Sequence, residues 1–156
     1  MKGQTLIEVL VALAVAALII SALSIAVLSS LNNAIFSKNQ NLASQYAQEG
    51  MEIMRRLKNS EWTVFNAYTT GDYCLDGGST SLRARQGDKC GQNIDIFMRE
   101  VFLEDTSSEC RNAYTSTKLK VSVYWSDGKC KDAVNPFCNK TEVVSCFNDA
   151  NVMTSL

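Results

Sequence analysis

Glu8 is the residue near the start of the chain whose charge needs an explanation. It follows a short head with one cation, Lys2, and it precedes twenty residues without a charge, Val9 to Leu28. An ionised carboxylate at the edge of so apolar a run is costly unless it meets water or a positive charge. The chemistry that this side chain can offer is therefore an ion pair at a membrane surface.

Six cysteines form the second group of residues with chemical potential. All of them follow the uncharged run, and they are Cys74, Cys90, Cys110, Cys130, Cys138 and Cys146. Lys2 favours a cytoplasmic position for the short head, which places the rest of the chain on the oxidising side of the membrane. An even number of cysteines there predicts disulfides, and six cysteines allow 15 pairings.

Other site chemistry has little support in this sequence. The chain has no histidine and no Cys-x-x-Cys pair, and zinc sites and nucleophilic cysteines depend on such residues. We therefore expect no metal, no cofactor and no catalytic residue. Two weaker patterns are Asp72 and Asp76 beside glycines, as calcium candidates, and the glycosylation sequon Asn139-Lys140-Thr141. A net charge of −1 gives no electrostatic footprint for nucleic acid.

The element that positions Glu8 is the uncharged run, residues 9–28. Twenty helical residues at about 1.5 Å each cover about 30 Å, the hydrocarbon thickness of a bilayer. Three interpretations compete. The run is a signal peptide cleaved after Ser24-Ile25-Ala26, a plain single-pass anchor, or a span preceded by a separate leader that ends at Gly3. A signal peptide prefers a more basic head and an apolar region of about 7–15 residues.

The third interpretation carries a family resemblance. The string from Lys2 to Leu13, KGQTLIEVLVAL, resembles the class III leader of type IV pilins and type II secretion pseudopilins. The resemblance implies that a membrane peptidase, the prepilin peptidase, cuts after Gly3 and methylates the new N-terminus at Gln4. It also places Glu8 at the fifth mature residue. One departure is Gln4, where the family usually has an aromatic residue or methionine.

The resemblance also implies a role for Glu8 in assembly. The new amine of one subunit would pair with Glu8 of another, so that two costly charges near the apolar slab compensate each other. The alternative is that the Glu8 side chain extends to the water at the membrane surface and has no role in assembly. The partners implied are the prepilin peptidase, other pilin or pseudopilin subunits and, before assembly, the inner membrane.

The remaining elements predict an α+β fold. We expect a leader at residues 1–3, one long helix at 4–59 with 9–28 in the membrane, and a disulfide-rich head at 60–156. No glycine or proline interrupts residues 4–49, and large apolar residues recur at helical spacing. That stripe consists of Ile35, Leu42, Tyr46, Ile53 and Leu57, with Gly50 on it as a point of close backbone approach.

Three segments of the head are predicted to be strands of a small antiparallel sheet. Residues 118–125 alternate between apolar and polar side chains, residues 94–103 are apolar on both faces as in a central strand, and residues 141–147 give a third. Sequential order is the simplest topology. With the helix segment Glu49-Gly50-Met51-Glu52, these strands look like those of PilV/GspI-type minor pilins and pseudopilins.

A hairpin between the last two strands gives a disulfide pattern. Placing Cys130 opposite Cys138 puts Trp125 opposite Val143 and Ser122 opposite Cys146. The pairs that follow are Cys130–Cys138 at the loop end, Cys110–Cys146 at the far end, and Cys74–Cys90 from the two cysteines that are left.

Two classes of function follow from these patterns. The first is a structural subunit, a minor pilin or pseudopilin of a type IV pilus or type II secretion-like filament, and not an enzyme. The protein would cross the membrane once with its N-terminus cytoplasmic and its head outside, and would later lie in a surface or periplasmic filament. The alternative is a membrane-anchored extracytoplasmic binding domain or enzyme with a pilin-like leader.

Overall fold

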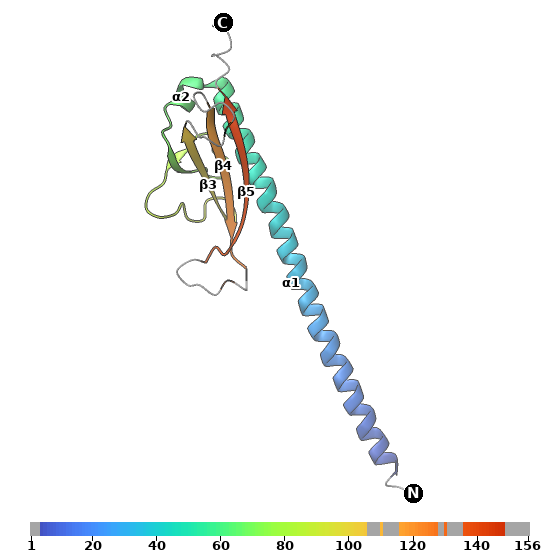
Figure 1. The fold of residues 1–156 in the computed structure, drawn as a ribbon. Helices are drawn as coiled ribbons and strands as arrows, with labels where there is room; N and C mark the ends of the chain where they lie inside the picture. Colours follow the sequence, from blue (N-terminus) through green and yellow to red (C-terminus); the bar gives the residue numbers. More distant parts are fainter. Residues whose placement is uncertain (1–3, 106–109, 111–115, 128–129, 131–135, 149–156) are drawn as a thin grey trace. The chain divides into compact units, whose positions relative to one another are not determined.

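The computed structural model describes residues 4–105, 110, 116–127, 130 and 136–148. The chain forms two compact units, residues 1–38 and residues 39–156. The fold is α+β, as the sequence predicts, with a long helix and an antiparallel sheet (Figure 1). Its elements are α1 (Gln4–Ser60), α2 (Trp62–Asn66), β1 (Gly71–Cys74), β2 (Arg83–Ala84), β3 (Phe97–Asp105), β4 (Ser116–Trp125) and β5 (Asn139–Asn148).

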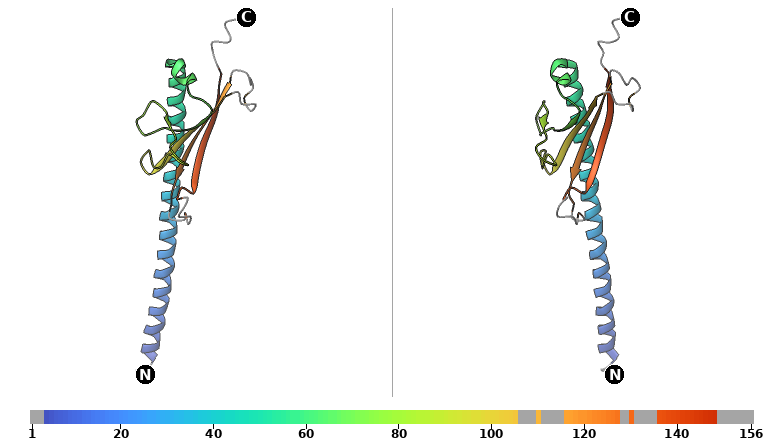
Figure 2. Two further views of the ribbon diagram at one scale, coloured as in Figure 1. Left: turned by 90° about the vertical axis from the view of Figure 1, so that its left-hand side faces the viewer. Right: turned by 60° about the vertical axis from the view of Figure 1, so that its left-hand side comes forward.

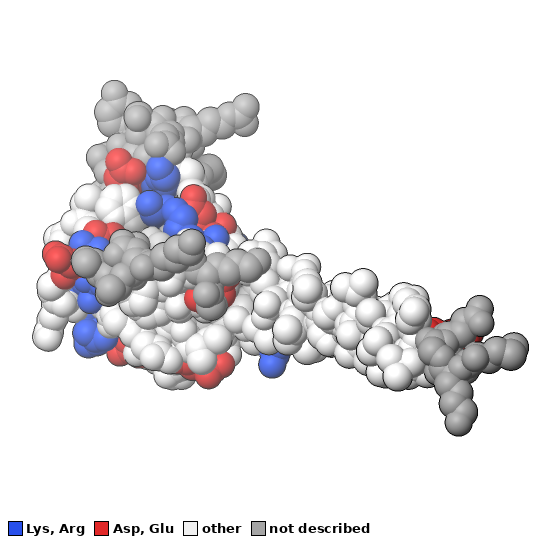
Figure 3. Space-filling model, turned by 90° about the horizontal axis from the view of Figure 1, so that it is seen from below, with Lys and Arg blue, Asp and Glu red and all other residues white. Residues whose placement is uncertain are grey.

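The first unit consists of the apolar part of α1. Its large apolar side chains from Leu6 to Ile35 are all between 50% and 70% exposed, and the space-filling view shows an uncharged surface along most of this segment (Figure 3). By length and composition this helix can cross a membrane. The hydroxyls of Ser21 and Ser24 donate to the carbonyls of Ala17 and Ile20, at 2.9 Å each. These polar groups are therefore satisfied within the helix, as lipid requires.

The second unit contains a five-stranded antiparallel sheet in the order β2-β1-β3-β4-β5 (Figure 2). The sequence predicts β3, β4 and β5 as sequential neighbours, and the structure confirms this order. It does not predict β1 and β2, because four residues and two residues are too short to show alternation. β1 pairs with the other side of β3, so β3 is a central strand, as its apolar residues on both faces indicate.

The core lies between the sheet and residues 39–60 of α1. The sheet contributes fully buried side chains from one face of β3 and β4, namely Phe97, Val101, Leu103, Leu119, Val121, Val123 and Trp125. The stripe predicted for the helix is wrong in part: Ile35 is exposed, and Leu42, Tyr46 and Ile53 are only half-buried. The buried face consists of Ala43, Ala47, Gly50, Met51, Met54 and Leu57. Small residues let the sheet come close, and a stripe defined by large residues overlooks them.

Gly50 is the point of closest approach between helix and sheet. A Cβ added there would lie 2.9 Å from Val121 Cγ1 and 3.3 Å from Arg99 Cδ. We expect Gly50→Ala to destabilise the protein by about 1–3 kcal/mol, because overpacking outweighs the gain of about 1 kcal/mol in helix propensity. Urea unfolding of the full-length protein in detergent measures this. In the double variant Gly50→Ala with Val121→Ala, the total loss of stability should be smaller than the sum of the losses in the two single variants, and additive losses would contradict the contact.

The predicted register of the β4–β5 hairpin is wrong. The structure pairs Trp125 with Asn139 and Ser122 with Glu142, a shift of four residues along β5 from the expected pairing. The cause is the connection between the strands: four residues separate Trp125 from Cys130, whereas Cys138 directly precedes Asn139. An even shift leaves each side chain on its expected face, so the inward face of β4 is as predicted.

Candidate functional site

The residues that the sequence assigns to processing and assembly lie at the start of α1. Gly3 falls outside the described residues, and Gln4 is the first residue of the helix. Glu8 follows one turn later with an exposed side chain. Within the part of the chain that the structure describes, Glu8 makes no ion pair with another side chain.

Three disulfides staple the head, and their pairs are those named from the sequence. They are Cys74–Cys90, Cys110–Cys146 and Cys130–Cys138, with Cα–Cα distances of 5.5, 5.8 and 5.5 Å. The first joins β1 to the segment before β3, and the second joins the segment between β3 and β4 to β5. The third closes the connection between β4 and β5. This pair forms although the register of the β4–β5 hairpin differs from the expected one, because both cysteines lie outside the strand ladder.

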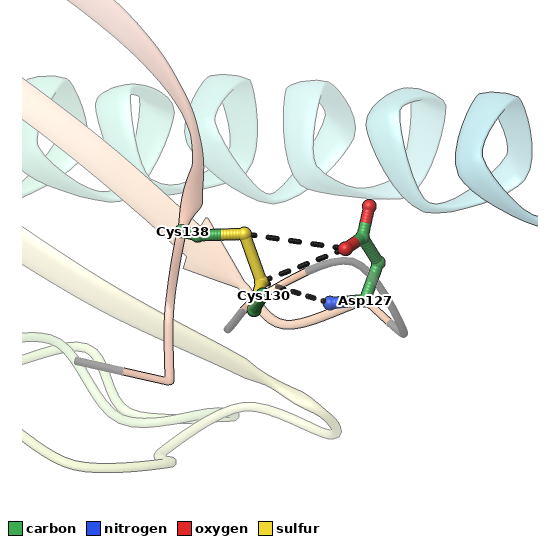
Figure 4. A group of neighbouring side chains, drawn as sticks. All are labelled: Asp127, Cys130 and Cys138. Carbon is green, nitrogen blue, oxygen red and sulfur yellow. Dashed lines mark hydrogen bonds between the residues drawn. A yellow bond between two sulfur atoms is a disulfide. The ribbon is translucent and has the colours of Figure 1, made fainter. Parts of the chain in front are cut away.

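The Cys130–Cys138 disulfide lies beside the carboxylate of Asp127 (Figure 4). Asp127 Oδ1 is 3.6 Å from Cys130 Sγ and 4.0 Å from Cys138 Sγ. The backbone N–H of Asp127 donates to Cys130 Sγ at 3.3 Å, and the N–H of Cys130 donates back to the Asp127 carbonyl at 3.1 Å. Since the sulfurs are bonded to each other and offer no thiolate, this cluster is a stapled turn rather than a metal centre.

The two calcium candidates are held by arginines. Asp72 pairs with Arg85 at 2.9 Å, and both carboxylate oxygens of Asp76 accept hydrogen bonds from Arg83 at 3.1 Å. The Arg83 hydrogen bonds hold the pKa of Asp76 below its usual value. These ion pairs tie β1 and the turn after it to β2 and to the residue that follows β2, so each carboxylate already has an arginine as its partner.

The glycosylation sequon lies in a folded strand. Asn139 is the first residue of β5, is half-buried, and pairs in the ladder with Trp125. Its Nδ2 points to Cys130 Sγ at 3.9 Å. An acceptor asparagine is usually presented on a surface loop, so this position is a poor fit for a glycan.

Sequence reasoning missed the buried charge at the centre of the head, Arg99. Its side chain is 0% exposed. Nε donates to the carbonyl of Leu75 at 3.1 Å, Nη1 to the carbonyl of Tyr46 at 3.2 Å, and Nη2 to the carbonyl of Asp76 at 3.3 Å. Nη1 also lies 3.5 Å from Glu49 Oε2. One guanidinium thus joins β3 to α1 and to the segment after β1.

The surroundings of Arg99 explain how a charge is tolerated there. Burial lowers the pKa of the guanidinium, and the neighbouring Glu49 carboxylate opposes this effect. The Asn93 side chain fixes the backbone, since its Oδ1 accepts from Arg99 N at 2.7 Å and its Nδ2 donates to Arg99 O at 2.9 Å. Gly50 leaves the room beside Arg99 Cδ. The signal in the sequence was a charged pair, Arg99-Glu100, inside an otherwise apolar strand.

Comparison with known proteins identifies the N-terminal segment. Residues 1–24 match the family model of the prokaryotic N-terminal methylation motif. The chain carries a class III leader. The match covers this N-terminal segment alone and is consistent with a type IV pilin-like protein, and such a leader implies processing by a prepilin peptidase and assembly with other pilins. No curated protein and no solved structure matches the chain.

The disulfides should contribute unequally to stability. The Cys110–Cys146 bond spans 36 residues and the Cys130–Cys138 bond spans 8. In the chain-entropy account, removing the longer link by paired Cys→Ser changes costs about 4 kcal/mol and removing the shorter one about 2.5 kcal/mol. Urea unfolding of the two variants measures the order, and non-reducing peptide mapping of the wild type checks the pairs. A Cys130–Cys146 peptide, or a larger loss for the shorter link, would contradict this arrangement.

Proposed function

We propose that this protein is a minor pilin or pseudopilin, a structural subunit of a type IV pilus or type II secretion-like filament that assembles through its N-terminal helix. The observation that carries the proposal is the methylation motif at residues 1–24, which extends from the start of the chain into the uncharged run, residues 9–28, of α1. The α+β head with its three disulfides is consistent with a location outside the cytoplasm, where disulfides form and persist.

The proposal assigns a role to each part of the chain. Residues 1–3 are a leader removed after Gly3, and Gln4 becomes the methylated N-terminus. Residues 9–28 cross the inner membrane before assembly, within a helix proposed as 4–59. Residues 60–156 form the extracytoplasmic head. The short N-terminus is cytoplasmic at first, and the mature subunit then enters a periplasmic or surface filament.

Abundance in the filament separates a minor subunit from a major one. We expect the protein in sheared filaments at a small fraction of the major subunit, measured by quantitative mass spectrometry. A protein that is processed but found only in the membrane fraction would favour an anchored binding domain or enzyme instead.

Glu8→Val tests the assembly role of the carboxylate. The variant should still be cut and should remain in the membrane, since a charge near the apolar slab has been removed. It should enter filaments about tenfold less, which corresponds to the loss of one ion pair of about 1.4 kcal/mol. The measurement is the ratio of filament to membrane protein, together with a direct binding assay to partner subunits.

The matched controls are Ile7→Val, which changes the neighbouring apolar residue, and Glu8→Asp, which keeps the charge. Both should assemble within about twofold of the wild type. Normal assembly and normal binding by Glu8→Val would rule out the pairing and leave Glu8 as a residue that only reaches the membrane surface.

A further inference from the structure

The two edges of the sheet differ greatly. β2, at one edge, has two residues, and the neighbouring Arg83–Asp76 and Arg85–Asp72 ion pairs lie beside it. β5, at the other edge, has ten residues, and all ten pair with β4 in one unbroken register without a bulge. Short, charged edges resist the addition of another strand, whereas long regular edges favour it. Of the two edges formed by the described strands, that of β5 alone has the length to accept a further strand.

The β5 edge is also incompletely covered. Inward-facing Thr141, Val143 and Ser145 are only half-buried, although the residues of β4 opposite them, Val123, Val121 and Leu119, are 0% exposed. On the outer face Val144 is 49% exposed. Both views of the ribbon place β5 at the outer side of the sheet (Figure 2). Among the described strands, none pairs with its free side. One more strand would cover these side chains and satisfy the exposed backbone groups.

We propose that the β5 edge, residues 139–148, binds an extended segment of another subunit as an added strand. This inference rests on the proposed function and names the contact that the head makes. The partner segment is defined by the outer face of β5, where Lys140 and Glu142 form an ion pair at 2.8 Å and Val144 follows. Opposite-charge cross-strand pairs stabilise and like-charge pairs destabilise. The segment therefore carries an acid opposite Lys140, a base opposite Glu142 and an apolar residue beside Val144.

A second copy of this chain does not fit the edge. Its β2 is too short to form a ladder with β5. Two β5 strands pairing antiparallel would be related by a two-fold axis. Because β5 and residues 39–60 of α1 run in the same direction (Figure 1), such a pair would point the two helices in opposite directions. Subunits inserted in one membrane share a single direction, which excludes this pair. A parallel pair of β5 strands in register would set Lys140 beside Lys140 and Glu142 beside Glu142, and like charges in neighbouring strands are destabilising. The added strand therefore belongs to a different subunit.

The decisive variant exchanges the charges without removing them. Lys140→Glu with Glu142→Lys keeps the net charge, the composition and the internal ion pair. It turns the exposed attraction between Glu142 and Lys120 into a weak repulsion, so thermal unfolding should change little. The exchange reverses the order of the positive and negative side chains that the partner strand contacts. We expect incorporation into filaments to fall about tenfold. The control exchanges Glu104 and Lys118, which lie 3.8 Å apart on β3 and β4 away from the edge, and it should assemble within about twofold of the wild type.

Cross-linking in assembled filaments gives a second readout. A photoreactive residue at position 144 should capture a different subunit, whereas one at position 96, where the native Ile96 is 45% exposed in the segment before β3, should not. Normal assembly of the exchanged variant together with no adduct from position 144 would overturn the inference while leaving the filament role intact. In that case Lys140 and Glu142 serve only to protect the edge from aggregation. Absence of the wild type from filaments would overturn the inference and the proposed function together.

Discussion

Arg99→Met should lower the free energy of unfolding by about 3 kcal/mol. The substitution leaves the carbonyls of Leu75, Tyr46 and Asp76 without their shared donor. Hydrogen bonds to a charged group contribute about 1.5–3 kcal/mol each, and the relief of burying a charge offsets part of that loss. A small domain is stable by only about 5–15 kcal/mol, so this change should be clear in urea unfolding of the full-length protein in detergent.

Two further variants separate charge from geometry at this site. Arg99→Lys keeps a positive charge but cannot reach three carbonyls from one point, so it should lose about 2 kcal/mol. Arg55→Met removes an exposed partner of Glu52, at 3.1 Å on the helix surface, and should cost less than about 1 kcal/mol. If Arg99→Met is as stable as the wild type, the buried guanidinium does not stabilise the contact between α1 and β3.

Gly3→Val should abolish processing. In the proposed function the peptidase cuts directly after Gly3, and a residue without a side chain fits a tight site there. The variant should remain full-length in the membrane and be absent from filaments, because the free amine at Gln4 never forms. Gly3→Ala, with one methyl group, should be cut more slowly. Normal removal of Met1–Gly3 from Gly3→Val would show that this glycine does not define the cleavage site.

The sequence patterns with the most predictive value were those that extend over the most residues. The uncharged run after Glu8 and the alternation of residues 118–125 each involve many positions, and the structure has a helix and a strand there. β1 and β2 were missed because a strand of two to four residues has no measurable period. The register of β5 was wrong because it depends on an asymmetric connection rather than on the strand pattern.

Buried polar interactions were the least predictable from the sequence. Arg99 is held by main-chain carbonyls from positions 46, 75 and 76, and no side-chain pattern reveals where distant carbonyls point. The buried helix face was misplaced for a related reason. Ala43 and Ala47 are fully buried, yet their size gives them little weight in a search for apolar stripes.

The intact mass of the wild-type protein isolated from the membrane tests the central claim most directly. The account predicts a chain that begins at Gln4, lacks Met1–Gly3 and carries one added methyl group at its N-terminus. Fragmentation of the N-terminal peptide should place that methyl on the amine of Gln4. A mature chain that begins near Val27, after ordinary signal-peptide cleavage, would contradict the pilin-like account, because the part of α1 that carries Glu8 and most of the uncharged run would then be absent from the mature protein.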